Sequence, residues 1–168
     1  TPVKEEVLKE MLPYFTEKFG NPSSLYDTGL EAKAAVTHAR EQVAALIHAD
    51  PKEVFFTAGG TESDNWALFG ACDKLKEKGN HIITTKIEHH AILHSCAFLE
   101  KHGFDVTYVG IDKDGRVNLK ELEDAITDKT ILISVMMVNN EIGTVQPIRE
   151  IAKIAKAHKI LFHTDAVK

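Results

Sequence analysis

The sequence contains little cysteine, no long apolar run and no excess of basic charge. Its two cysteines, Cys72 and Cys96, stand in helix-like contexts and form no CxxC pair, which fits a reducing compartment. We expect both thiols to be small side chains of the core. No apolar run approaches the roughly 20 residues that span a bilayer, and no signal peptide opens the chain. We therefore expect a cytoplasmic protein with no membrane partner.

Lysine and arginine are scattered along the chain, and the formal net charge is −5. This distribution does not favour nucleic acid or an anionic membrane surface as a partner. No linker rich in proline, glycine or serine is present and no segment repeats, so we expect residues 1–168 to lie in one domain with no internal boundary. The chain opens on Thr1-Pro2 without an initiator methionine and stops at Lys168 just after a strand-like segment. We therefore expect that domain to be truncated.

Helical and strand-like patterns alternate along the chain. A helical spacing over 3–19 is interrupted near Pro13, a loop follows at 20–24, and a second helical pattern covers about 30–48. Beyond residue 80, strands are expected at 81–85, 105–111, 130–138 and 160–164, and helices at 90–102, 119–126 and 148–158. Strands that alternate with helices of this length predict an α/β fold, a mostly parallel sheet with helices on both faces.

The stretch 53–65 reads EVFFTAGGTESDN and combines three signals. Its apolar residues 54–56 predict a short buried strand, and Gly59 and Gly60 end that strand. Thr61 stands where the N-cap of a helix is expected, and that helix runs toward Lys78. A strand, a glycine turn and a helix start bring free backbone N–H groups and the positive end of a helix dipole to one point. That point can hold a phosphate group.

Polar residues follow the expected strands at the edge where parallel strands end. They are the clusters 59–62, 88–90 and 139–141 and the single residue Asp165. In parallel sheets, ligands collect at the carboxyl ends of the strands. Pyridoxal 5'-phosphate (PLP) requires such a set: a helix N-terminus for its phosphate, a carboxylate for its ring nitrogen, a donor for its phenolic oxygen and a flat group against its ring.

Five motifs carry a specific resemblance. They read GNPSS at 20–24, FFTAGGTES at 55–63, IEHHAIL at 87–93, VNNEIGTVQPI at 138–148 and HTDAV at 163–167. The motifs occur in the order that cysteine desulfurases have. The chain therefore resembles the N-terminal half of the large domain of these enzymes, which are PLP-dependent and have the class-V aminotransferase fold (PLP fold type I). The segment 138–148 is more similar to the desulfurases that serve iron–sulfur assembly and tRNA thiolation than to selenocysteine lyases.

The resemblance implies a role for each matching residue. Gly60 and Thr61 would hold the cofactor phosphate, and His89 would stack on the ring and assist proton transfers as the catalytic residue. Asn140 would lie near the phenolic oxygen, and Asp165 would pair with the ring nitrogen. Without the resemblance, His89 could equally be a histidine at a helix start, and Asn140 and Asp165 could be ordinary turn or cap residues.

The chain departs from the family pattern at two positions. Lys168 stands where the family usually has glutamine, so it enters the predicted cofactor site as a cationic donor, and Tyr26 stands where the family usually has histidine. The lysine that binds the cofactor covalently, the cysteine that accepts sulfur and the arginine that binds the substrate carboxylate lie further along the family's chain than residue 168. Neither Lys168 nor Cys96 is expected to replace them.

The implied reaction removes sulfur from L-cysteine and gives L-alanine and an enzyme persulfide. The implied partners are a second copy in a homodimer and an iron–sulfur scaffold or another sulfur-acceptor protein. Two alternatives stay open. The parent could be another PLP enzyme of this fold, such as a selenocysteine lyase or an aminotransferase, or the chain could be a non-catalytic fragment that folds or dimerises.

Two patterns suggest metal ligands at first inspection. His90 and His94 are four residues apart on an expected helix, but no HExxH motif or third ligand accompanies them. Asp112, Asp114 and Glu121 match positions of a calcium loop, yet the first ligand position is occupied by Gly110. A turn leading into the next helix accounts for this segment better. We therefore expect no metal site.

Overall fold

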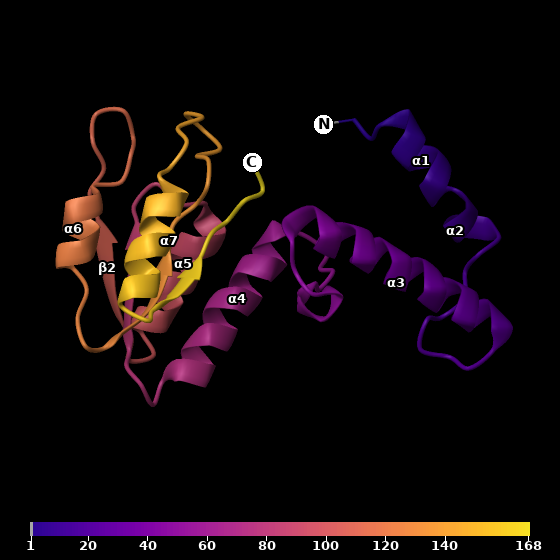
Figure 1. Ribbon diagram of the computed structural model, residues 1–168, viewed down its shortest axis with the longest axis horizontal. Helices are drawn as coiled ribbons and strands as arrows, with labels where there is room; N and C mark the ends of the chain where they lie inside the picture. The colour runs from indigo at the N-terminus through magenta and orange to yellow at the C-terminus, as the bar shows by residue number, and fades with distance from the viewer. Residues whose placement is uncertain (1) are drawn as a thin grey trace. The chain divides into compact units, whose positions relative to one another are not determined.

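The computed structural model describes residues 2–168, which divide into two compact units between Phe56 and Thr57 (Figure 1). The N-terminal unit is helical, and the C-terminal unit contains the sheet. Units of this kind can belong to one domain, so the expected absence of an internal domain boundary stays a prediction.

The N-terminal unit consists of α1 (Glu5–Met11), α2 (Pro13–Thr16), α3 (Asp27–Ile47) and the short 3-10 helix η1 (Pro51–Glu53). Pro13 is the first residue of α2, where its missing N–H group costs nothing, so the helix prediction for 3–19 and its interruption are confirmed. The helix α3 has 21 residues. From residue 2 to residue 168, no helix is both long enough and apolar enough to cross a bilayer.

The strand predicted at 54–56 is wrong. Val54 has an extended backbone, with φ −97° and ψ 123°, but the segment does not join the sheet. The carbonyl oxygen of Val54 instead accepts a hydrogen bond from Nε of Arg40 at 3.1 Å, and the guanidinium group of Arg40 lies 5.3 Å from the ring centroid of Phe56. Phe55 and Phe56 remain 63% and 51% exposed. Apolar composition favours a strand, but a strand also needs a neighbour in the ladder.

The C-terminal unit alternates helices and strands. Its elements are α4 (Gly60–Leu75), β1 (His81–Thr85), α5 (His90–Glu100), β2 (Asp105–Val109), α6 (Leu119–Asp124), β3 (Thr130–Ser134), α7 (Ile148–Ala157) and β4 (Leu161–His163). The four strands lie in the order β2-β1-β3-β4, and every neighbouring pair is parallel. The predicted parallel α/β sheet is confirmed.

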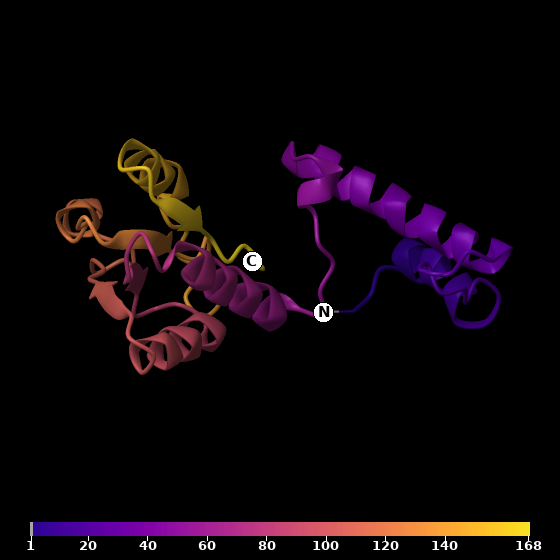
Figure 2. The same cartoon turned by 90° about the horizontal axis from the view of Figure 1, so that it is seen from below.

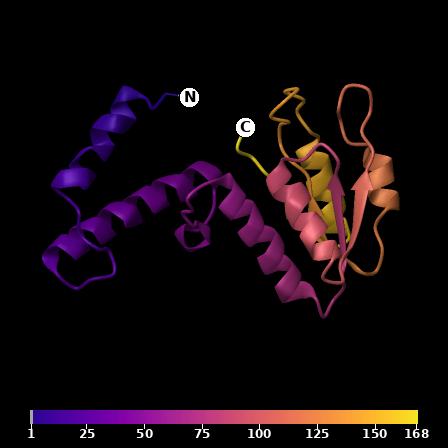
Figure 3. The same ribbon diagram turned by 180° about the vertical axis from the view of Figure 1, so that it is seen from behind.

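Helices cover both faces of this sheet, as the sequence predicts. Seen from below, the strands lie between the pair α4 and α5 and the pair α6 and α7 (Figure 2). The view from behind shows α5 across the near side of the strands (Figure 3). Side chains alternate along each strand, so Ile82 and Leu132 pack with α4 and α5, whereas Ile83 and Ile133 pack with α6 and α7. All four side chains are fully buried.

Both cysteines belong to the first of these two core clusters. Cys72 on α4 and Cys96 on α5 are 1% and 0% exposed, which confirms the expectation that they are core side chains. Burial raises the pKa of the Cys72 thiol to about 11 and that of the Cys96 thiol to about 12. Since the thiolate is the nucleophilic form, neither side chain is set up to accept sulfur.

The strand β3 ends at Ser134, four residues before the predicted end. The chain nevertheless stays beside the extension of β4, because the N–H groups of Val135 and Met137 donate to the carbonyl oxygens of His163 and Asp165 at 3.2 and 2.8 Å. These two bonds fix where the chain beyond β3 lies relative to the chain beyond β4, and so they position Asp165.

Candidate active site

One cavity of about 280 Å³ collects all of the residues that the sequence predicts for the cofactor site. Its lining includes Gly60, Thr61, His89, Asn140, Asp165 and Lys168. They come from the start of α4, the start of α5 and the segments that follow β3 and β4, so they meet at the carboxyl ends of the strands. Sequence reasoning missed four further lining residues, namely Asp64, Met136, Val138 and Val167.

The helix α4 begins two residues earlier than predicted. Its N-cap is Gly59, with an extended backbone, and Thr61 is the second helical residue, so the assignment of Thr61 as N-cap is wrong. No side chain caps this helix from the N-cap position, and the carboxylate of Glu62 instead accepts from the N–H of Ala58 at 2.5 Å. Thr61 therefore does not cap the helix as its N-cap residue, and it lines the cavity.

The first turn of α4 presents unused backbone donors. Within the described part of the chain, the earliest backbone bond into this turn runs from the N–H of Ser63 to the carbonyl of Gly59 at 3.2 Å. The N–H groups of Gly60, Thr61 and Glu62 therefore have no backbone acceptor. Free N–H groups at the positive end of a 16-residue helix fit an anionic group such as phosphate.

Gly60 also lets the C-terminal segment approach the start of α4. A Cβ atom at this position would lie only 2.9 Å from Cγ2 of Val167, so a larger residue would displace the segment. Lys168, the next residue, lines the cavity and is exposed. Its placement is compatible with the predicted role as a cationic donor, and that role stays a prediction.

His89 fills the position of N-cap for α5 and lines the cavity as well. Its Nδ1 atom accepts a hydrogen bond from the N–H of Ala91 at 3.1 Å. Because Nδ1 is the acceptor, the proton of the neutral imidazole sits on Nε2. The helix-start role and the site role are therefore compatible, and the first fixes the tautomer for the second.

Both the backbone carbonyl and the side chain of Asp165 accept hydrogen bonds. Its carbonyl oxygen accepts from the N–H of Met137 at 2.8 Å, and its Oδ1 atom accepts from the N–H of Val167 at 3.0 Å. The residue is 9% exposed. A carboxylate fixed in this way can pair with a positive group inside the cavity.

The two neighbouring asparagines differ in what they contact. Asn140 is exposed and lines the cavity, and its side-chain N–H group donates to Oε1 of Glu141 at 3.0 Å. Asn139 is buried, donates to the carbonyl of Ile87 at 2.7 Å and accepts from the N–H groups of Glu141 and Ile142 at 2.9 and 3.0 Å. Asn139 thus joins the loop before α5 to the loop after β3.

Replacing Asn139 by alanine should lower the free energy of unfolding by about 2 to 3 kcal/mol, because one carbonyl and two N–H groups lose their partner. Urea denaturation followed by circular dichroism measures this loss. The matched change Asn140→Ala removes one exposed contact and should cost less than about 0.5 kcal/mol. Equal losses in the two variants would show that Asn139 does not join the loops.

Glu88 connects two of the segments that carry the cavity residues. Its carboxylate accepts from the hydroxyl of Thr85 at 2.7 Å and from the N–H of Met136 at 3.1 and 3.0 Å to its two oxygens. The residue is 5% exposed and directly precedes His89. Glu88 therefore connects the end of β1 to the segment that follows β3, and it restrains the position of the backbone at His89.

Asp64, Glu88 and Asp165 influence one another electrostatically. Burial raises the pKa of Glu88 to about 7 against its own hydrogen bonds, and the charges of Asp165 and Asp64 act in the same direction as burial. Burial also raises the pKa of Asp64 to about 6, Asp165 adds to the increase, and His89 opposes it. Asp64 stands four residues after Gly60 on one helix, so helical spacing places both residues on one face. That spacing was the signal in the sequence that could have found Asp64.

Of the remaining candidates, those in the C-terminal unit do not line this cavity. Tyr26 lies in the N-terminal unit, where it precedes α3 and is 79% exposed. The rings of His90 and His94 lie 5.4 Å apart between centroids, but no group of three metal-ligating side chains exists among residues 2–168. Asp112 accepts from the N–H groups of Asp114 and Arg116, which confirms the predicted turn.

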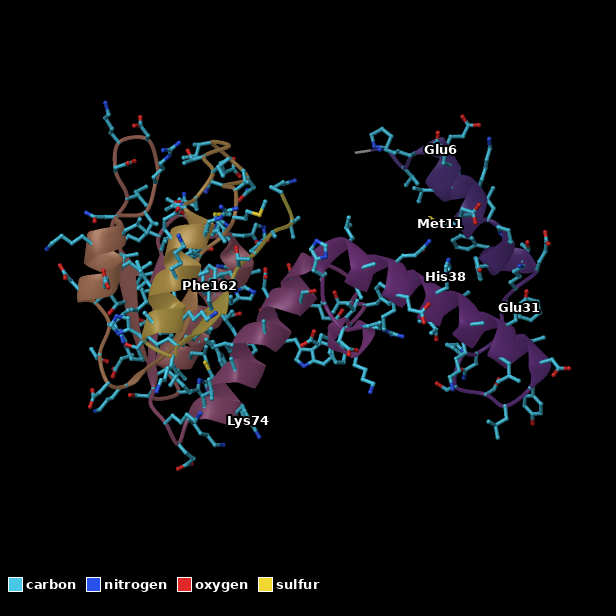
Figure 4. All side chains as sticks on the ribbon, in the orientation of Figure 1. Glu6, Met11, Glu31, His38, Lys74 and Phe162 are labelled. Carbon is cyan, nitrogen blue, oxygen red and sulfur yellow. The ribbon has the colours of Figure 1, made fainter. Side chains whose placement is uncertain are left out.

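A larger groove of about 830 Å³ runs along α4 and β4 and contains none of the predicted cofactor residues. Lys74 and Phe162, labelled in Figure 4, belong to its lining. It offers no free helix start comparable to that of α4, so the smaller cavity is the candidate active site.

Comparison with protein families matches residues 1–168 to aminotransferase class V. A cysteine desulfurase of Clostridium botulinum, IscS, is 59% identical over 168 residues, which cover all of this chain and 42% of that relative. The chain thus spans less than half the length of this relative.

Solved structures give the same result. A NifS-like protein matches 100% of this chain and 47% of its own with a TM-score of 0.97 and 42% identity. SspA, solved in complex with cysteine, matches 99% of this chain and 48% of its own with a TM-score of 0.95 and 44% identity. The predicted resemblance to cysteine desulfurases is confirmed.

Proposed function

Because the chain belongs to the class-V aminotransferase family, we propose that its C-terminal unit binds PLP. We further propose that the longer protein removes sulfur from L-cysteine and gives L-alanine and an enzyme persulfide. The observation that carries the proposal is the single cavity that brings together a free helix start, a histidine of fixed tautomer and a buried carboxylate.

The donor set fits the chemistry of the cofactor. The N–H groups at the start of α4 and the hydroxyl of Thr61 would hold the phosphate. Asp165 would face the ring nitrogen, and Asn140 and Lys168 would lie near the phenolic oxygen. When bound, PLP withdraws electrons from the substrate through its protonated ring, which is why a carboxylate at the nitrogen matters.

His89 is the residue of this chain proposed to move protons. Its Nδ1 atom accepts from the N–H of Ala91, so Nε2 is the ring atom that carries the exchangeable proton. The same bond restrains the rotation of the imidazole of this cavity-lining residue. His89 can therefore both flank a flat ring and exchange a proton at Nε2.

Sulfur acceptance and covalent attachment of the cofactor are assigned to residues outside this chain. Cys72 and Cys96 are buried and have raised pKa values, so neither suits the acceptor role. A homodimer in the cytoplasm that passes sulfur to an iron–sulfur scaffold or another acceptor protein completes the proposal. The cysteine in the SspA structure supports the substrate class.

The test is a titration of the purified chain with PLP, followed by visible absorption. We expect reversible binding that weakens at least tenfold in Asp165→Ala, because the ring nitrogen loses its counter-ion. Asp114→Ala, an exposed aspartate in a turn, serves as the matched control and should bind as the wild type does. Binding that is unaffected by Asp165→Ala would contradict the assignment. Borohydride reduction that links PLP to a lysine of this chain would show that covalent attachment does not need a residue outside it.

A further inference from the structure

The cavity holds a second carboxyl group that the proposed roles leave unused. Asp64 on α4 and Asp165 after β4 both line it, and they are 4% and 9% exposed. Oδ1 of Asp165 accepts from the N–H of Val167 at 3.0 Å. Asp64 accepts no hydrogen bond from residues 2–168, and its nearest partner is Nε2 of His163 at 3.6 Å. Ionising a carboxyl group that is largely removed from water and has no donor is costly, so a positive group that enters the cavity would stabilise the ionised form of Asp64.

Among residues 2–168, no lysine or arginine lies within ion-pair distance of Asp64. Burial lowers the pKa of His163 on β4, whose Nδ1 atom is 2.9 Å from the hydroxyl of Ser134, so this ring is neutral at pH 7. The other titratable groups that face Asp64 are His89 at the start of α5, Glu88 beneath it and Asp165. Lys168 lines the cavity but lies within ion-pair distance of no acidic side chain of the described chain.

Resting on the proposed function, we propose that Asp64 and Asp165 form a carboxyl pair that holds one proton on Asp64 at weakly acidic pH, and that a cationic ring nitrogen in the cavity displaces this proton. The O–H bond of the Asp64 carboxyl breaks, and the proton leaves to solvent. Nothing is oxidised or reduced. At and below about pH 6, binding of the cation thereby adds a second negative charge to the site.

The physical basis is a change in the charge that acts on Asp64. Without a cation, burial and the charge of Asp165 both disfavour ionised Asp64 and raise its pKa to about 6. A positive nitrogen between the two carboxyls replaces repulsion by attraction and favours ionisation. PLP should therefore bind more tightly as the pH rises through 6, by up to about tenfold for a change of roughly one pKa unit.

The pair is tested first without any ligand. Carboxyl-carbon NMR of the purified chain should show Asp64 titrating near pH 6, and Asp165→Asn should lower that midpoint by roughly one pH unit. Asp114→Asn is the control and should leave the midpoint unchanged. A midpoint near the ordinary value of 3.8 in the wild type, or one that ignores Asp165→Asn, would overturn the carboxyl pair.

Displacement of the proton is tested by calorimetry with PLP at pH 6, in buffers that differ in heat of ionisation. The wild type should release up to roughly half a proton more per PLP bound than Asp64→Asn, whose amide mimics the protonated acid. The deaza analogue, in which carbon replaces the ring nitrogen, should abolish that difference. Equal release in both proteins, or an equal difference with the analogue, would overturn displacement by the ring nitrogen.

Failure of the proposed function has a different signature. Neither PLP nor its analogue would then bind the wild type, Asp64→Asn or Asp114→Asn. The ligand-free titration still decides whether Asp64 and Asp165 share one proton. A coupled titration without PLP binding would keep the carboxyl pair and reject PLP as the cation of this chain.

Discussion

Replacing Leu132 by alanine should lower the free energy of unfolding of the C-terminal unit by about 3 to 4 kcal/mol. Leu132 lies in the middle of β3, is fully buried and packs against Leu68 of α4 and Ile92 of α5. Alanine would leave a void among these side chains, and the sheet between two helix layers has little freedom to close it. The midpoint and slope of urea denaturation measure the change.

The matched control is Leu161→Ala. Leu161 is the partner of Leu132 in the register between β3 and β4, but it lies on an edge strand and is 49% exposed. Since much of its side chain is already in water, truncation should cost about 1 kcal/mol or less. Comparable losses at the two positions would mean that the sheet is not packed between the helix layers.

The sheet could be predicted because its strands carry a strong local signal. The segments HIITT at β1 and TILIS at β3 are rich in β-branched and apolar residues, and every residue in them is buried. Helical spacing between such segments leaves few topologies other than a parallel sheet. Once the sheet is parallel, the strand ends share one edge, and the cavity residues can be expected there.

The segment 54–56 shows the limit of the same reasoning. Its composition matches that of a strand, yet Arg40 takes up the carbonyl of Val54 and the segment stays outside the sheet. Ladder partners come from distant parts of the chain, so composition alone cannot supply them. The end of β3 differs from the prediction for a related reason, because the side-chain carboxylate of Glu88, and not a backbone carbonyl of β1, accepts from the N–H of Met136.

Within the site, the sequence predicts residues that end strands and misses contacts between distant ones. Glu88 belongs to a predicted cluster, but its bonds to the N–H of Met136 span 48 residues and leave no local pattern. Asp64 lies inside a helix, where a polar residue is ordinarily exposed. Its burial becomes visible only when α4 is packed against the sheet.

Raising the pH from about 5 to 8 should destabilise the chain through Glu88. Burial raises the pKa of this carboxyl from the ordinary 4.5 to about 7, so the folded chain binds its proton more readily than the unfolded chain does. The stabilisation from this proton is fully present below pH 4.5 and is lost as the pH rises through 7. A pKa difference of this size between the folded and the unfolded chain corresponds to a loss of unfolding free energy on the order of 3 kcal/mol.

The variant Glu88→Gln isolates that contribution, because a glutamine does not titrate. Its free energy of unfolding, measured in urea at each pH, should fall less than that of the wild type between pH 5 and 8. Asp64, whose raised pKa acts in the same direction, and His163, whose lowered pKa acts in the opposite one, are present in both proteins, so the comparison removes most of their contribution. Glu141→Gln, at an exposed position, should follow the wild type. If Glu88→Gln followed it as well, the carboxyl of Glu88 would have to be ionised throughout this range, held by Thr85 and Met136 strongly enough to offset burial.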